Sequence, residues 1–207
     1  MTNVSTEFSC KSSSELTDHE PCRHDKGKVR GYELSLFRNA SLADIQFLFN
    51  FIDRFTLNRV IDELMNAERV FILGSGENYS SAMFMSYLGS MQFGNWGAIQ
   101  PSTKYVPGEE PETFGRADVV FAISTAPSED KNPFKDFTIQ IAKCARDGDA
   151  IVVAVVDERD TALTTLASHV LYVPCQSDIL RSHVVTAILV ETIIGVTVIR
   201  SDISMPE

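Results

Sequence analysis

The 207-residue chain is long enough for one domain with a terminal extension, and such a domain can bury its core without disulfides. Its 28 acidic and 18 basic residues give a formal net charge of −10, which repels phosphate backbones and anionic lipid. Binding to nucleic acid by this chain alone, or to a membrane, is therefore not expected. Cys144 and Cys175 lie in apolar patterns and nothing at the start reads as a secretory signal, so we expect a cytoplasmic protein.

The first segment, residues 1–34, is rich in polar and charged residues, and its few apolar residues show no period. We expect a loosely ordered tail there and a single domain over residues 35–207. The tail also contains four residues of metal-binding type whose spacing matches no common zinc site: Cys10, His19, Cys22 and His24. The sequence thus predicts no metal and no cofactor.

Two helices are predicted at the start of the domain. Ser41 and Asp44 form a capping-box pair, and apolar residues follow at helical spacing up to Ile52. A second helix follows Thr56. Its apolar stripe is typical of a helix packed on a sheet and comprises Leu57, Val60, Ile61, Leu64 and Met65.

The remainder alternates strand-like and helical segments. The predicted strands are 70–73, 98–100, 119–124, 151–156 and 170–173. The third and fourth are almost wholly apolar, as strands covered on both faces must be. Between them, Pro133 and Gly148 bracket a helix. This order predicts an α/β fold, a three-layer α/β/α sandwich with a five-stranded, doubly wound, flavodoxin-like parallel sheet.

The loops after two of these strands carry the polar residues of interest, because ligands bind beyond the carboxyl ends of parallel strands. The first loop begins at Gly74 and leads into a helix whose N-terminal N–H groups suit an anion or a polar ligand. A dinucleotide fingerprint fits poorly, since Tyr79 replaces its third glycine. The second loop begins at Ser124.

Segments in a specific order resemble the SIS (sugar isomerase) domain. These are residues 69–82, 119–125, 149–156 and 163–173, within a likeness that runs from about Leu42 to Arg200. The nearest resemblance is to the ligand-sensing domain of RpiR-type sugar-phosphate regulators, whose preceding helices are similar to residues 41–65. The helix-turn-helix domain of such regulators has no counterpart in the polar tail.

The resemblance implies that the hydroxyl-bearing loops bind a phosphosugar or a related sugar, in a homodimer or homotetramer. Asn78 stands where the family usually has serine. In the second loop, one hydroxyl stays in the family's register and two lie outside it. The residues expected to bind the ligand are Ser75, Gly76, Glu77, Asn78, Ser80, Ser124, Thr125 and Ser128.

The last helix offers two catalytic candidates, because Ser182-His183 and Glu191 resemble a Ser-Arg…Asp pattern near the end of the RpiR-type domain. His183 could transfer protons between adjacent sugar carbons, or could be a hydrogen-bonded interface histidine. Glu191 has apolar sequence neighbours, so it is either a paired structural carboxylate or a base. Residues 184–199 are apolar nearly all round, which favours a buried helix at a subunit interface.

Three functions remain open from the sequence. The first is a sensor or binding protein for a carbohydrate derivative. The second is an aldose–ketose phosphosugar isomerase, in which His183 and a carboxylate move the proton. The third is a non-catalytic structural or partner-binding subunit, since a fold alone does not guarantee activity.

Overall fold

The computed structural model describes residues 31–74, 76–100, 113–125, 133–157, 161–173 and 183–204. Five parallel strands form one sheet, in the order β2-β1-β3-β4-β5. They are β1 (Arg69–Gly74), β2 (Trp96–Ala98), β3 (Asp118–Ser124), β4 (Ile151–Val156) and β5 (His169–Tyr172). The predicted five-stranded parallel sheet is thus confirmed.

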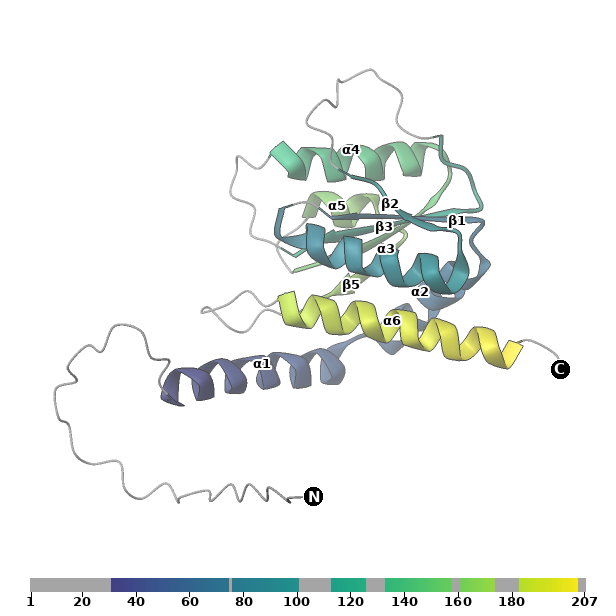
Figure 1. Cartoon of the computed structure of the whole chain (residues 1–207). Coiled ribbons are helices and arrows are strands. Elements are labelled where there is room, and N and C mark those ends of the chain that lie inside the picture. The colour runs from purple at the N-terminus through teal and green to yellow at the C-terminus, as the bar shows by residue number, and fades with distance from the viewer. Residues whose placement is uncertain are drawn as a thin grey trace, which may run out of the picture.

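Helices cover both faces of this sheet (Figure 1). They are α1 (Gly31–Phe51), α2 (Arg54–Asn66), α3 (Tyr79–Phe93), α4 (Pro133–Asp147), α5 (Thr161–Leu166) and α6 (His183–Ser204). Helices α4 and α5 pack on one face, while α2, α3 and α6 pack on the other. Helix α1 lies outside this sandwich, against α6. The three-layer α/β/α architecture is as predicted.

The core is divided by the sheet into two clusters, and β3 shows the division. Val119, Phe121 and Ile123 belong to the cluster under α2, α3 and α6, whereas Val120 and Ala122 belong to the cluster under α4 and α5. All five side chains are at most 1% exposed. Successive side chains of a strand point to opposite faces, so a central strand with both faces covered must be apolar throughout.

Strand β2 begins two residues earlier than predicted. Gly94 ends α3 in a left-handed conformation, with φ of 78°, and its N–H donates to the carbonyl of Ser90. The chain then pairs with β1 directly, since the carbonyl of Asn95 accepts from the N–H of Val70. Trp96 packs in the core at the start of β2, because the residue is 4% exposed and its ring stacks on Phe93.

Helix α2 begins at Arg54 because Asp53 caps it. The carboxylate of Asp53 accepts a hydrogen bond from the hydroxyl of Thr56 at 2.6 Å and from the N–H of Phe55 at 3.0 Å. These two donors hold the pKa of the Asp53 carboxyl below its usual range. The predicted apolar stripe of this helix lies in the core.

Helix α1 differs from its prediction. It begins at Gly31, ten residues before the predicted start, so residues 31–34 of the predicted tail are helical. Ser41 and Asp44 do not form a capping box at a helix start, because both lie inside the helix and Asp44 is 2% exposed. The capping signal is wrong here because apolar residues at helical spacing continue upstream of it.

Helix α6 is longer than the apolar run that predicted it. Within the described ranges it is the one helix long and apolar enough to cross a membrane, over His183–Asp202. The core helix of a soluble protein meets the same criteria of length and hydropathy. Helices α1, α2 and α3 of the same chain pack against α6. Val185, Leu189 and Ile193 are at most 1% exposed. Since 39% of the apolar window of α6 is buried inside the described chain, packing within one chain accounts for part of its apolar character.

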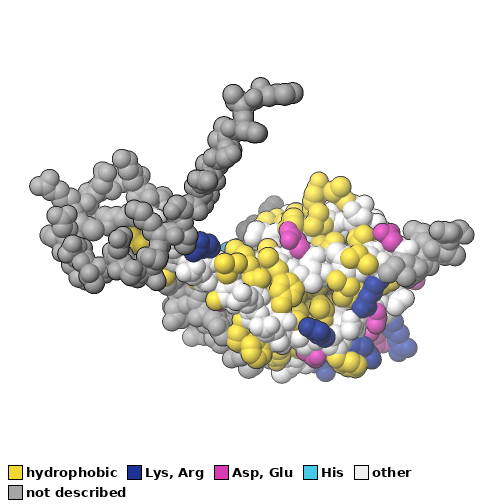
Figure 2. All heavy atoms as spheres, turned by 90° about the horizontal axis from the view of Figure 1, so that it is seen from below, with side chains coloured by type: hydrophobic (Ala, Val, Ile, Leu, Met, Phe, Trp, Pro, Cys, Tyr) yellow, Lys and Arg dark blue, Asp and Glu magenta, His cyan; other side chains and the backbone are white. Residues whose placement is uncertain are grey.

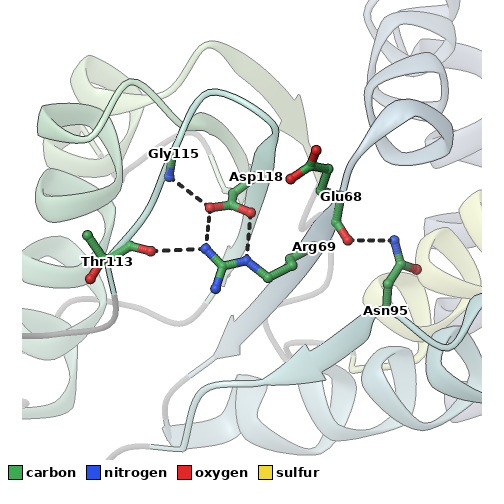
Figure 3. A network of polar contacts seen from close by, with 6 residues as sticks. All are labelled: Glu68, Arg69, Asn95, Thr113, Gly115 and Asp118. Carbon is green, nitrogen blue, oxygen red and sulfur yellow. Dashed lines mark hydrogen bonds and ion pairs between the residues drawn. The ribbon is translucent and has the colours of Figure 1, made fainter.

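A polar network joins β1 and β3 where both strands begin (Figure 3). Arg69 donates through Nε and Nη2 to the two carboxylate oxygens of Asp118, at 2.9 and 2.7 Å, and the N–H of Gly115 donates to Asp118 at 2.8 Å. The hydrogen bonds from Arg69, followed by that from Gly115, hold the pKa of Asp118 below its usual range despite the opposing effect of burial. This network fixes the amino ends of the strands, opposite the loops of interest.

Candidate functional site

The two polar loops meet at the carboxyl ends of β1 and β3. These strands are neighbours, with Gly74 paired to Ile123. From β1 the chain turns to β2 on one side, and from β3 it turns to β4 on the other. The order matches the flavodoxin-like order, in which the β1/β3 switch point is where ligands bind. The topology therefore singles out this rim as the candidate site.

Asn78 and Thr125 join the two loops directly. The hydroxyl of Thr125 donates a 2.6 Å hydrogen bond to Oδ1 of Asn78. Asn78 is 3% exposed and Thr125 is partly buried, so the bond is largely shielded from water. Because the amide oxygen of Asn78 accepts this bond, its orientation is set by Thr125 and not by its own helix.

The turn that carries Asn78 is held close to the end of β1. It is a short 3₁₀ turn, Gly76–Asn78, in which Gly76 has φ of 58°. A Cβ on Gly74 would lie 2.6 Å from the carbonyl oxygen of Asn78 and 3.0 Å from Cβ of Ala82. Glycine at position 74 thus lets the start of α3 approach the strand, and this approach positions Asn78.

The N-terminus of α3 opens onto the same rim. Asn78 is the N-cap residue of α3, yet its side chain makes no capping hydrogen bond. Asparagine is among the preferred N-caps because its oxygen usually accepts from the first helical N–H groups. Here that oxygen is engaged by Thr125, and Asn78 has helical backbone angles, φ −81° and ψ −8°, so its side chain does not cap α3. The positive end of the helix dipole lies at this rim, where it suits a polar or anionic ligand.

Thr186 extends the pair into α6. It is 1% exposed, and its hydroxyl oxygen lies 3.5 Å from that of Thr125, at the outer limit of a hydrogen bond. Since Thr125 gives its single hydroxyl proton to Asn78, Thr186 is the donor in this contact. Three polar side chains from two loops and the last helix thus form one chain of contacts. The sequence carries no signal for Thr186, which lies in an apolar helix.

Asp157 is a second residue at this rim that the sequence analysis missed. It directly follows β4 and is 4% exposed. Ser124 pairs with Val156 across β3 and β4, so the residues that follow them, Thr125 and Asp157, occupy neighbouring positions on the same face. The signal was available, because an acid that ends an apolar parallel strand lies at the ligand-binding edge of the sheet.

The other predicted ligand residues are spread around these contacts. Gly76 and Ser80 are exposed, in the turn and in the first turn of α3, and Ser124 is partly buried at the end of β3. Glu77 lies in the turn, but its side chain is outside the described part of the chain. Ser75 and Ser128 also fall outside the described residues. Of the predicted set, the contacts above bring Asn78 and Thr125 together.

The two catalytic candidates are not brought together. His183 is the first residue of α6 and is exposed, and Glu191 is exposed further along the same helix. Eight residues of α-helix separate them by about 12 Å along the axis. Glu191 also lies about 140° around the helix from Thr186, so it faces away from the rim. Glu191 is exposed in the described chain, and its apolar sequence neighbours do not reveal which side of an all-round apolar helix faces the core.

The sequence matches no family model and no curated protein at a significant level, and the findings come from solved structures. The Vibrio vulnificus NanR protein complexed with ManNAc-6P superposes with a TM-score of 0.64 at 18% identity, covering 83% of this chain and 63% of that one. The sugar isomerase domain of the RpiR transcription factor from Sphaerobacter thermophilus gives a TM-score of 0.65 at 14% identity, covering 84% and 93%.

A third similar structure is a hypothetical protein from Methanococcus jannaschii, for which a molecular function of 3-hexulose-6-phosphate isomerase is inferred. It gives a TM-score of 0.59 at 18% identity, covering 83% of this chain and 92% of that one. The chain spans less than two thirds of the NanR protein but nearly all of the other two. It therefore has the fold of the sugar isomerase domain, as the sequence resemblance predicted.

Proposed function

We propose that this protein binds a carbohydrate derivative, a phosphosugar or a related sugar, at the β1/β3 rim, and that it acts as a sensor or binding protein. The observation that carries the proposal is the hydrogen bond from Thr125 to Asn78. It ties together the two loops at the switch point of the sheet, at the start of α3. The helix end then supplies N–H donors to a phosphate, while the hydroxyl and amide groups suit sugar hydroxyls.

Two of the similar structures support the class of ligand. The NanR protein is complexed with ManNAc-6P, and the function inferred for the Methanococcus jannaschii protein is that of an isomerase of a hexulose phosphate. These are statements about those proteins, and sequence identities of 18% carry the fold alone to this chain. The polar contacts of Asn78, Thr125 and Thr186 are the independent support from this chain's own residues.

A binding role is favoured over turnover by the placement of the acid and base candidates. Moving a proton between adjacent sugar carbons needs an acid or base within hydrogen-bond reach of the reacting atoms. Glu191 is exposed on a side of α6 that faces away from Thr186, and His183 is exposed at the start of that helix. These two residues therefore do not form an acid–base pair at the rim.

A thermal-shift panel tests the binding proposal. Sugar phosphates, the corresponding free sugars and inorganic phosphate are each added to the full chain at millimolar concentration. A ligand that binds the folded state raises Tm by mass action, and at about 100 times its Kd it adds roughly 2.7 kcal/mol. We expect at least one sugar phosphate or sugar to raise Tm more than inorganic phosphate does. No shift across the panel contradicts the proposal.

The alternative function is an aldose–ketose phosphosugar isomerase. His183 favours it, because this exposed imidazole lies one helical turn before Thr186 and an imidazole can serve as a general acid or base. An isomerase exchanges a carbon-bound hydrogen of its substrate for deuterium in heavy water, and NMR of the sugar detects the exchange. Ligand binding without exchange supports the sensor. Neither binding nor exchange, together with a stable protein partner, indicates a structural subunit.

The proposal includes a soluble, cytoplasmic protein that forms a homodimer or homotetramer. The cytoplasm is where sugar phosphates are made and consumed, and the net charge of −10 suits a soluble protein. Assembly is supported by large apolar side chains that the described part of one chain leaves exposed on α1 and at the start of α2, among them Tyr32, Phe51 and Phe55.

A further inference from the structure

We infer that Asp157 determines which sugars the rim accepts, because its carboxylate accepts hydrogen bonds from hydroxyl groups of the ligand. Asp157 directly follows β4 and is 4% exposed. The inference rests on the proposed function and deepens it, since it names the chemical group that the ligand presents to the end of β4. That group is a sugar hydroxyl and not a phosphate.

The two ends of the sheet surround their buried acids with different neighbours. Asp118 is 3% exposed at the amino end of β3, where the neighbouring strand places Arg69 beside it. The bidentate bond from Arg69 neutralises that carboxylate and makes it a structural group. At the carboxyl end, the positions beside Asp157 on the two neighbouring strands are Thr125 and Val173. The strands thus give Asp157 a hydroxyl neighbour on one side and an apolar neighbour on the other.

Asp157 lies on the same face of the sheet as the contacts of Thr125. Val153 and Val155 of β4 belong to the core cluster under α2, α3 and α6, and alternation along the strand gives Asp157 that face. Thr125 shares the face, since its hydroxyl lies 3.5 Å from that of Thr186 in α6. Neighbouring strands are about 4.8 Å apart, so one ligand can contact both the Thr125 hydroxyl and the Asp157 carboxylate.

The helical layer over this face is largely apolar. Figure 2 shows the molecule from the side of α1 and α6, where hydrophobic side chains spread between a few charged ones. Val185 and Leu189 of α6, both 1% exposed, belong to the core cluster on this face. A carboxylate buried in such surroundings is costly unless hydrogen-bond donors reach its oxygens. Asp157 interacts within the chain, and its two oxygens offer about four acceptor sites, so a ligand hydroxyl can bind in addition.

A sugar hydroxyl is the part of the ligand that fits the end of β4. A carboxylate accepts hydrogen bonds, so it binds a hydroxyl, whereas it repels a phosphate at the same place. The proposed position for a phosphate is the start of α3, which follows β1, and β1 lies two strands from β4. At about 4.8 Å for each strand the two positions are roughly 10 Å apart. One sugar can therefore present its phosphate to β1 and a hydroxyl to Asp157.

The test removes the two partners of this hydrogen bond one at a time. The probes are the sugar phosphates of the thermal-shift panel, among them glucose 6-phosphate, fructose 6-phosphate and ManNAc-6P. For the one that binds most tightly, analogues that each lack one hydroxyl group are titrated by isothermal calorimetry into the full-length chain, Asp157→Ala and Asp157→Asn. Asp149→Asn is the control, because it removes the same charge just before β4, at the opposite end of the strand. Circular dichroism and Tm check the fold of each variant.

In the original chain, the loss of one particular hydroxyl should weaken binding by at least about tenfold, because hydrogen bonds to charged groups are the strong ones. In Asp157→Ala, the parent compound and that analogue should bind equally, within about twofold. Asp157→Asn keeps an acceptor oxygen without the charge, so the difference between the two compounds should shrink to about threefold. Asp149→Asn should keep the full difference.

Three results would overturn the inference and leave the proposed function in place. The first is the same difference in the original chain and in Asp157→Ala. The second, which applies if Asp157→Ala does not fold, is an undiminished difference in Asp157→Asn. The third needs no variant and is an original chain that binds every analogue as tightly as the parent compound. If no compound of the panel binds, the proposed function fails, and the inference fails with it.

Discussion

The hydroxyl of Thr125 lies 2.6 Å from Oδ1 of Asn78, although 47 positions separate the two residues in the sequence. The pairing of β1 with β3 brings them to one rim, and the absence of a side chain at Gly74 lets the turn of Asn78 approach. This hydrogen bond therefore depends on the strand order of the sheet and on the close packing of α3 against β1. It lies at the N-terminus of α3.

Replacing Thr125 with valine removes the hydroxyl and keeps the shape of the side chain. Oδ1 of Asn78 then loses its donor in a buried position, which costs about 1–3 kcal/mol. Chemical denaturation should show this loss, and the thermal-shift panel should show a smaller ligand-induced rise in Tm, since the two loops are no longer tied together by this bond.

Thr192→Val is the matched control for this substitution. The hydroxyl of Thr192 donates within α6, to the carbonyl of Ile188 at 2.7 Å, and so takes no part in the bond that joins the two loops. We expect little change in the ligand response of this variant. An equal loss of ligand response in both variants would show that the effect is not specific to the Thr125–Asn78 bond.

Substituting Gly74 with alanine tests the close approach of the turn to β1. The added Cβ would lie 2.6 Å from the backbone carbonyl of Asn78, so the turn must move, at a cost of about 1–3 kcal/mol. Urea denaturation measures the cost, and ligand binding should weaken with it. Gly97→Ala is the control, because a Cβ there meets nothing within 4 Å, and its stability should change by less than about 0.5 kcal/mol.

Asp157 is expected to set the preference of the rim between charged and neutral ligands. A carboxylate at the position next to Thr125 repels a bound phosphate group. This repulsion weakens phosphate binding by about 1 kcal/mol or more at near-surface dielectric. Asp157→Asn should therefore tighten binding of a sugar phosphate by roughly fivefold while changing the affinity for the free sugar less. Isothermal titration calorimetry with both ligands makes the comparison. Parallel changes for the two ligands would remove Asp157 from this role.

The Arg69–Asp118 pair predicts a specific pH dependence of stability. Asp118 has a pKa lowered in the folded state, so its contribution is present above the unfolded pKa of about 3.9 and is lost as the pH falls through the lower, folded pKa. At pH 7, Asp118→Asn should cost about 1–3 kcal/mol, and this difference should shrink below about pH 4. Urea denaturation at several pH values measures both.

The exposed pair of Arg116 and Asp149, at 3.2 Å, provides the control for that experiment. Its side chains are 86 and 66% exposed, so Asp149→Asn should change stability by less than about 1 kcal/mol at any pH. A pH-independent loss in Asp118→Asn would mean that the buried carboxylate is not stabilised in its charged form.

The sheet was predictable because a strand that is buried on both faces is apolar at nearly every position. The wholly apolar run Val119–Ile123 can only be a covered central strand, and parallel topology then requires the following loop to lie at the ligand-binding edge. Asn78 and Thr125 were found in this way. Asp157 follows the same rule one strand further and could have been found by it.

What could not be predicted depends on which side of a helix is covered. Thr186 and Glu191 lie in the same apolar helix, one buried and the other exposed, and the apolar residues around each do not show which side of the helix is covered. Likewise, the early start of α1 was missed because the capping-type pair of Ser41 and Asp44 lies inside the helix. The burial of such helical residues is decided by neighbours that are distant in sequence.

The most direct test is an NMR titration of the ¹⁵N-labelled chain with the sugar phosphate that raises Tm most. Binding should shift the side-chain amide signal of Asn78, identified by its loss in Asn78→Asp, together with the backbone signals at the start of α3 and of Thr125. Shifts confined to residues away from the carboxyl ends of β1 and β3, with the Asn78 amide unmoved at saturation, would contradict the proposed site.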